Sequence, residues 1–540
     1  MGKTGGKTLK RSNMKRFFTI KKGRQQNRAF ARRAWNFAIR PLSCIIFLTL
    51  CHAAAAQKTG SLWLAGYDEF PGVPGYGHAQ IRISDDTVLV EPAALAFNFE
   101  STVAVMTGPD GNLLFYTNGC EVANRQHQVV PNGAGLNPGD IGGLVCPGKG
   151  YIVPQGAMIL PDPGNPARYY LLHTGAAYDP VRKLRLGPLY FTGVDMSLQN
   201  GLGDLTAKNN ILQAGDLGTF TAVRHGNGRD WWVIVPEFGN RVWHTFLLGP
   251  DGFSPMPPQT MLLSEVECEK HIGTAASLQG DRLANWGDCK VTVLDFDRCA
   301  GVLANALEIP APTHWIPGGG VAFSPNGRYL YATSQNVLFR ADLQPDPPGP
   351  IRLDTVRFSY DPLRESPFDV PGNTFHALVN GPDGRIYGNI PSRARHLHAL
   401  RNPDSDTIAA AKLDFRARGV PLPVSNVRTL PHLPNYRLTS LAGSICDTLG
   451  IVGAPELSAL PDAFRIRPNP VQDFLLVDYP DYSGGTLRAT LHNTQGVLLR
   501  SVEQAGNPLR MTTSNLPSGV YILQLWQGDR LVGSKRVIVI

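Results

Sequence analysis

The chain has 540 residues, 43% of them hydrophobic, which is enough for several packed domains and excludes a disordered polymer. Its formal net charge of +8 is unevenly placed: residues 1–56 hold 13 of the 51 Lys and Arg and no acidic residue, which leaves 38 basic against 43 acidic residues from Gln57 onward. A mildly acidic body excludes the usual electrostatic basis of nucleic-acid binding, so we expect no nucleic-acid partner.

The N-terminal region has the layout of a secretory signal peptide. Basic residues precede an apolar stretch from Leu42 to Leu50, and small residues follow up to Ala56. We predict a leader over residues 1–56, starting at Met1 or Met14, with cleavage after Ala56. The apolar stretch is about half as long as a bilayer span requires, so we expect no transmembrane helix in the mature chain.

Six cysteines follow the leader, an even number that suits disulfides in an exported chain. Proximity favours Cys120 with Cys146, and one pair among Cys268, Cys289 and Cys299. The alternative is that several of them are buried free thiols. No C-x-x-C motif occurs, and we expect no cofactor.

One pattern, a tight turn followed by an apolar or aromatic run, recurs along residues 57–446. Gly108 to Thr117, GPDGNLLFYT, is the clearest copy. Asp, Asn and Gly tolerate the left-handed turn conformation, and the run behind them pairs back as a strand. The steps between the turn markers are 55, 62, 53, 46 and 57 residues, for Asp110, Asn165, Asn227, Gly280, Asn326 and Asp383.

Such a period predicts an all-β chain folded as a β-propeller, with about seven blades and six as the alternative. A strand at SLWLAGY, beginning at Ser61, is expected to close the ring by pairing with the last blade. In VAFSPNGRYLYATS, Val321, Phe323, Leu330 and Ala332 alternate with polar partners, as in a half-buried strand pair.

Several stretches, in order over most of residues 61–440, resemble a family of secreted propeller-like proteins from Bacteroidetes-type bacteria. They include FNFESTVAVMTGPDGNLLFYTNGC, YIVPQGAMILPDPGNPARYYLLHT, RHGNGRDWWVIV, VAFSPNGRYLYATS and the late LPHLPNYR. The resemblance implies a propeller fold and a location outside the cell. It implies no particular chemistry, because most members of that family have no assigned activity.

The tail begins after a linker over residues 447–463. Alternating strands and turn glycines over residues 464–540 predict a small immunoglobulin-like β-sandwich. The tail resembles the type A C-terminal sorting domain of the type IX secretion system. The matching positions are Pro468, Asn469, Pro470, Val471, Gly496, Leu516, Ser518, Gly519, Tyr521, Ile522 and Lys535.

This second resemblance implies recognition by the type IX secretion machinery and delivery to the extracellular space or the outer-membrane surface. The sorting domain is commonly cut off afterwards. The alternative is an accessory sandwich that stays attached to the propeller.

No common catalytic motif is present, so we name no catalytic residue. Gly143 to Lys149 has the spacing of a phosphate-binding loop, but Gly150 stands where a hydroxyl residue is needed. A metal site stays open: Glu265, Glu267, Glu269 and His271 would share one face of a strand, as a cation site or as a charged edge. Asp295 with Asp297, and His225 with Asp230, have the same ambiguity.

We therefore predict a propeller that binds a glycan or protein partner. Aromatic candidates for sugar stacking are Tyr76, Trp286 and Trp315. The alternative is a secreted hydrolase or lyase whose site is assembled from several blades, and a purely structural surface-layer role is the third hypothesis.

Overall fold

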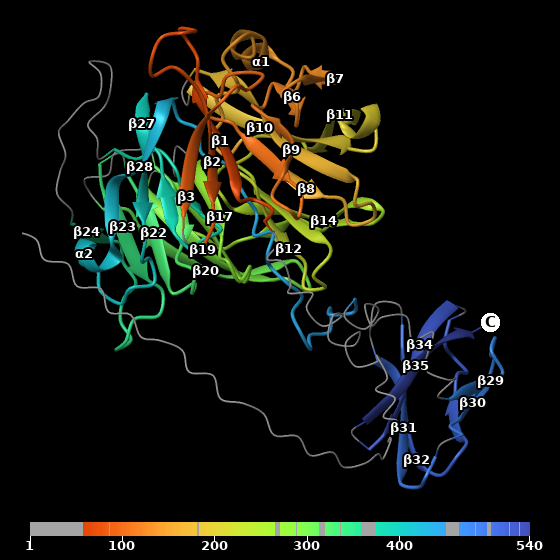
Figure 1. Cartoon of the computed structure of the whole chain (residues 1–540). Coiled ribbons are helices and arrows are strands. Elements are labelled where there is room, and N and C mark those ends of the chain that lie inside the picture. Colours follow the sequence, from red (N-terminus) through yellow and green to blue (C-terminus); the bar gives the residue numbers. More distant parts are fainter. Residues whose placement is uncertain are drawn as a thin grey trace, which may run out of the picture. The chain divides into compact units, whose positions relative to one another are not determined.

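The structure, a computed structural model, describes residues 58–539 except 86, 181–182, 265–270, 288, 313–318, 335, 358–373, 392, 450–463, 481, 494–497, 518 and 529. Strands dominate this part of the chain (Figure 1). Within the described residues no helix is long and apolar enough to span a membrane.

Antiparallel sheets follow one another along the first part of the chain. The first contains β1 (Leu62–Tyr67), β2 (Gly77–Ile83) and β3 (Val88–Ala93). The second contains β4 (Ala104–Thr107), β5 (Leu113–Thr117), β6 (Glu121–Asn124) and β7 (Val129–Ala134). The third contains β8 (Ala157–Pro161), β9 (Arg168–Asp179), β10 (Lys183–Asp195) and β11 (Asp204–Gln213). The fourth contains β12 (Thr221–Arg224), β13 (Trp231–Pro236), β14 (Val242–Gly249) and β15 (Gly252–Pro255), with β16 (Gln259–Thr260) beside β14.

Three further sheets complete the series. The fifth contains β17 (His271–Ala276), β18 (Arg282–Gly287), β19 (Lys290–Asp297) and β20 (Val302–Pro310). The sixth contains β21 (Val321–Phe323), β22 (Tyr329–Thr333), β23 (Leu338–Asp342) and β24 (Asp354–Val356). The seventh contains β25 (Leu378–Asn380), β26 (Ile386–Gly388), β27 (Ala394–Leu400) and β28 (Phe415–Asn426). The short helices are α1 (Asp140–Val145), η1 (Gln199–Gly201) and α2 (Ala410–Leu413).

The recurring turn joins the first two strands of every sheet from the second to the seventh. At Asp110 the side-chain carboxylate accepts the backbone N–H of Asn112 at 3.0 Å, and Gly111 has φ of 82°. At Asn326 the side-chain oxygen accepts an N–H two residues on at 2.9 Å, and Gly327 has φ of 73°. A side chain would be strained at either glycine, so the turn chemistry requires these residues.

Consecutive residues of a strand face opposite neighbouring sheets, because side chains alternate along a strand. Trp231 packs in the core shared with the third sheet, and Trp232 packs in the core shared with the fifth. The half-buried pattern expected at residues 321–332 is therefore wrong in one respect. Val321 and Phe323 do share a face, but Ala322 and its neighbours on the other face are buried too, because the seventh sheet covers them.

Packing of the first sheet against the seventh closes the ring. Trp63 and Ala65 share a core with Tyr387 and Leu397, and the Trp63 and Tyr387 rings meet edge to face with centroids 5.3 Å apart. The chain is thus an all-β propeller over these residues, as predicted. The expected pairing of the first strand with the last blade is wrong: β1 pairs with β2, and β28 already supplies the fourth strand of the seventh sheet. The number of blades stays a prediction, because several stretches of this region, including residues 265–270, 313–318 and 358–373, lie outside the described residues.

The tail is a sandwich of two antiparallel sheets, also as predicted. One sheet contains β29 (Arg465–Arg467), β30 (Phe474–Asp478) and β33 (Leu509–Thr512). The other contains β31 (Thr486–His492), β32 (Leu498–Ala505), β34 (Gly519–Gln527) and β35 (Arg530–Val539). Alternate residues such as Leu475, Leu487 and Leu523 meet between the sheets in one core.

Candidate functional site

The central segment, residues 428–446, follows the last propeller strand and runs among the inner strands of the ring. The Tyr436 hydroxyl donates to the carbonyl of Ile159 on β8 at 2.7 Å. His432 Nδ1 donates to the carbonyl of Gln155 at 3.2 Å. Similar bonds to backbone carbonyls run from Thr429 to Phe99, from Asn435 to Leu278 and from Arg437 to Pro382.

A cavity of about 90 Å³ remains beside the central segment. Parts of β12, β17, β21 and β25 line it, together with residues 432–438. Its polar lining consists of hydroxyl, amide and imidazole groups and Arg437, and no carboxylate is found among the described residues that line it. It has space for a few ordered waters and is too small for a sugar ring.

The His432 and Tyr436 side chains of the central segment are uncharged at neutral pH. Complete burial lowers the pKa of His432 to about 4 and raises the pKa of Tyr436. Each is therefore neutral where it bonds to a backbone carbonyl, so the contacts are neutral hydrogen bonds at physiological pH.

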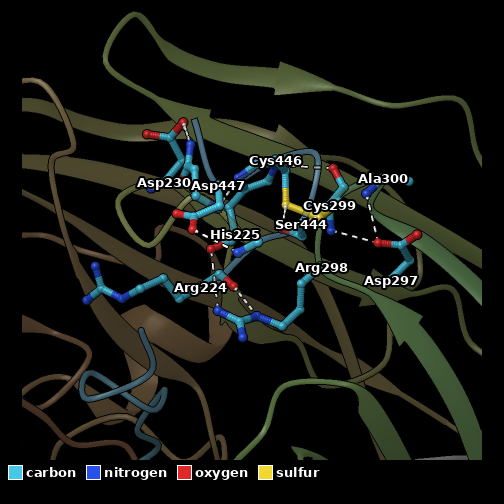
Figure 2. Close-up of a disulfide and its surroundings, with 12 residues drawn as sticks. Arg224, His225, Asp230, Asp297, Arg298, Cys299, Ala300, Ser444, Cys446 and Asp447 are labelled. Atoms are coloured by element: carbon cyan, nitrogen blue, oxygen red, sulfur yellow. Dashed lines mark hydrogen bonds between the residues drawn. A yellow bond between two sulfur atoms is a disulfide. The ribbon is translucent and has the colours of Figure 1, made fainter. Parts of the chain in front are cut away.

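Two arginines, the buried Arg298 and the half-buried Arg224, bond to the later part of the central segment (Figure 2). Arg298 donates from Nε to the carbonyl of Arg224 at 2.9 Å and from Nη2 to the carbonyl of Thr439 at 2.5 Å. Arg224 in turn donates to the carbonyl of Tyr436 at 3.2 Å, with its guanidinium 4.1 Å from the ring centroid of Trp231. Burial lowers the pKa of Arg224 to about 10, so it is still a cation at neutral pH.

A disulfide between Cys299 and Cys446 links the end of the central segment to the fifth sheet (Figure 2). The predicted pair Cys120–Cys146 is confirmed. Cys299 is not part of the pair expected among Cys268, Cys289 and Cys299, because the central segment brings a cysteine from 147 residues away to it. Cys268 lies outside the described residues. Cys289 is also disulfide-bonded.

The two polar pairs that the sequence offered as possible cation sites, His225 with Asp230 and Asp295 with Asp297, form hydrogen bonds with neighbouring protein groups. His225 Nε2 donates to the carbonyl of Cys299 at 3.1 Å, while Asp230 accepts the Asn227 amide at 2.7 Å within its own turn. Asp295 accepts the Asn305 amide at 2.8 Å, and Asp297 accepts two backbone N–H groups, from Cys299 and from the next residue.

The other candidates lie apart from one another. Trp286 is fully buried in the core, and Tyr76 packs edge to face on Phe70 with ring centroids 5.0 Å apart. Gly143 belongs to α1, next to the Cys120–Cys146 disulfide. Several predicted positions, and the side chain of His271, lie outside the described residues: Ala56, Glu265, Glu267, Glu269, Trp315 and Gly496.

The motif at the start of the tail is tied to its last strand. Asn469 Oδ1 accepts the N–H of Ile538 on β35 at 2.8 Å, and Val471 donates its N–H to the carbonyl of the same residue at 2.8 Å. Pro468 and Pro470 line a surface pocket of about 290 Å³. The Asn469 side chain therefore helps to fix the two ends of the sandwich together.

The later motif positions lie on the two final strands. Gly519 begins β34 opposite Val539, and the buried Tyr521 donates its hydroxyl to the carbonyl of Pro517 at 2.6 Å. The Lys535 ammonium lies 5.6 Å from the ring centroid of Phe464.

No curated protein matched the chain. Among solved structures, a proposed 6-phosphogluconolactonase from Bacteroides uniformis is similar at 13% identity, with 69% of this chain and 98% of that chain covered and a TM-score of 0.41. A second one from Bacteroides fragilis has 11% identity, 68% and 97% coverage and a TM-score of 0.42. A protein from Lactobacillus plantarum has 12% identity, 68% and 98% coverage and a TM-score of 0.41. Similarity at this level says nothing about activity.

A family model described as a secretion system C-terminal sorting domain matches residues 465–540. The match covers the sandwich from the first residue of β29 onward. Residues 465–540 of this chain therefore belong to the secretion system C-terminal sorting domains, the family that the type IX system uses for export.

Proposed function

We propose that this chain is an exported protein whose propeller binds a glycan or protein partner outside the cell. In this proposal the leader occupies residues 1–56 and is cut after Ala56, and the propeller extends over residues 57–446. The linker covers residues 447–463, and the sorting domain covers residues 464–540. The observation that carries the proposal is the sorting domain, because it supports type IX export.

The disulfides support the extracellular part of the proposal. Cys120–Cys146 and Cys299–Cys446 join segments that are 26 and 147 residues apart in the sequence. Such cross-links form and persist in oxidising compartments, which include the periplasm and the cell exterior.

The central segment bears on where a ligand binds. Residues 428–446 lie among the inner strands, and the cavity of about 90 Å³ beside them is smaller than a sugar or a peptide requires. A ligand of either kind is therefore expected on the outer surfaces of the sheets or on the loops that join them.

Deleting the sorting domain tests the export part of the proposal. In a bacterium that makes this protein, the chain without residues 464–540 should accumulate in the periplasm, while the complete chain reaches the surface or the medium. A matched control keeps the tail and replaces Gln504, a residue of the exposed strand β32, with Ala. Normal surface delivery of the truncated chain would refute the sorting role.

A further inference from the structure

A cleft of about 470 Å³ lies between the first and the seventh sheet. We call it the arginine cleft. Its walls come from β3 and from β26, β27 and β28 with the residues next to them. It is lined by Val88, Val90, Arg385, Tyr387, Ala399, Arg401, Arg416, Gly419, Val420 and Pro421.

The pairing of β27 with β28 shapes one wall of the cleft. The register of this pair shifts between Leu397 and Ala399, and Arg418 takes a left-handed φ of 57°. A Cβ at Gly419 would lie 3.1 Å from the Cβ of Ala399 and 2.8 Å from that of Arg416, so the strand approaches its neighbour closely there. Such bulges redirect side chains on a sheet, and here the wall carries Arg416.

The described residues that line the cleft carry three guanidinium groups and no carboxylate. Arg385 lies 3.2 Å from Asp383, whose fully buried carboxylate also accepts the Tyr387 hydroxyl at 2.7 Å. That carboxylate is therefore held inside the protein by two neighbours. Among the described residues, the three arginines of the lining outnumber the two carboxylates, those of Asp383 and Asp414, that are given as their partners.

Arg401 and Arg416 share a single carboxylate. Arg416 donates from Nε to Asp414 at 2.6 Å, and Nη1 of Arg401 lies 3.5 Å from the other oxygen of the same group. Their side chains are 60% and 47% exposed for Arg416 and Arg401, respectively. Each guanidinium has about five N–H donors, so one carboxylate cannot satisfy both groups. The outer donors face solvent at the cleft.

The remaining lining is apolar: Val88, Val90, Val420, Pro421 and the ring of Tyr387. These side chains form an apolar floor, while most of the accessible surface of the cleft is polar. The volume of about 470 Å³ lies in the usual size range of a small-molecule site. Guanidinium pairs bind planar or tetrahedral oxyanions through parallel N–H bonds.

We propose that the arginine cleft binds the carboxylate or sulfate group of an acidic saccharide. The inference rests on the proposed function, because an exported binding protein meets polysaccharides outside the cell. The oxyanion bonds to Arg401 and Arg416, and the sugar ring lies on the apolar floor.

Calorimetric titration of the purified chain from Gln57 onward tests the proposal. The probes are trigalacturonate, a sulfated chondroitin disaccharide, neutral maltotriose and inorganic sulfate. One of the two acidic saccharides should bind, and its affinity should fall with added salt. R401Q and R416Q should each weaken this binding at least about tenfold, as expected for a charge-assisted hydrogen bond.

Two further variants separate binding from folding. D414N frees both arginines and should tighten binding, by up to about fivefold for the loss of one exposed ion pair. R352Q is the matched control, because Arg352 pairs with Asp354 on the surface at 3.0 Å and does not line the cleft. It removes one positive charge and should leave the affinity unchanged.

Equal affinity of R401Q, R416Q and the unchanged chain would overturn the proposal. Inorganic sulfate binding as tightly as the saccharides would overturn the saccharide part. If maltotriose alone binds, and R401Q and R416Q bind it as tightly as the unchanged chain does, the cleft assignment fails while the proposed binding function survives. If no probe binds, the cleft assignment fails, and the export test still decides the rest of the proposed function.

Discussion

Removing the Cys299–Cys446 disulfide should destabilise the propeller more than removing Cys120–Cys146. The two cross-links span 147 and 26 residues. In the chain-entropy account, the free energy that a cross-link removes from unfolding grows with the logarithm of the loop length. It gives about 5 kcal/mol for the longer loop and about 3.5 kcal/mol for the shorter one at 25 °C. We therefore expect C299A/C446A to lose about 1.5 kcal/mol more than C120A/C146A.

The assay is guanidinium-induced unfolding followed by tryptophan fluorescence without reductant. Trp526 is the single tryptophan of residues 464–540, so a Trp526→Phe background makes the signal report on the propeller. The two double variants are compared in this background with a reference chain that retains all its native disulfides.

An equal or greater loss of unfolding free energy in C120A/C146A would refute this reasoning. It would mean that local packing, and not loop closure by the central segment, sets the contribution of the longer cross-link.

Three further predictions concern single residues. Tyr436→Phe leaves the Ile159 carbonyl without its hydroxyl partner and should cost about 1–3 kcal/mol of unfolding free energy, measured by the same fluorescence titration. The pKa of His432 is about 4 in the folded chain and 6.5 in the unfolded chain. Its contribution to stability is therefore complete above pH 6.5 and is lost as the pH falls toward 4. The loss amounts to about 3 kcal/mol, and His432→Gln should flatten the dependence of stability on pH over this range; an unchanged slope would contradict the assignment. Asn469→Ala removes the hydrogen bond between the Asn469 side chain and the N–H of Ile538, and should cost the tail about 0.5–1.5 kcal/mol of unfolding free energy. Scanning calorimetry of the full chain should therefore show a lower melting temperature for the tail. An unchanged melting temperature would argue against that bond.

The propeller could be predicted because each sheet from the second to the seventh carries its own local turn signal. The turns at Asp110 and Asn326 depend on residues two positions apart, and these residues are visible in the sequence. The sandwich could be predicted for the same reason, and Cys120–Cys146 because the two residues lie only 26 positions apart.

The parts that could not be predicted depend on closure of the ring. The arginine cleft joins Val88 to Arg416, which meet only because the first sheet packs on the seventh. Cys446 reaches Cys299 only through the path of the central segment. The two prolines of LPHLPNYR, Pro431 and Pro434, indicate a non-strand segment, but nothing local places it inside the ring.

The burial of both faces of a strand was missed for a related reason. Alternation in the sequence shows that Val321 and Phe323 share one face, yet tyrosines on the opposite face carry a polar group and resemble exposed positions. Tyr331 is fully buried because its hydroxyl donates to the carbonyl of Pro403 at 2.7 Å. That partner is 72 residues away and has no signal in the local pattern.

The most direct test of export by the sorting domain is mass spectrometry of the mature protein from fractionated native cells and their medium. We predict a chain that starts near Gln57, ends before about Phe464 and lies at the cell surface or in the medium. A chain that keeps residues 464–540 and stays in the periplasm would contradict the account and make the sandwich part of the working protein.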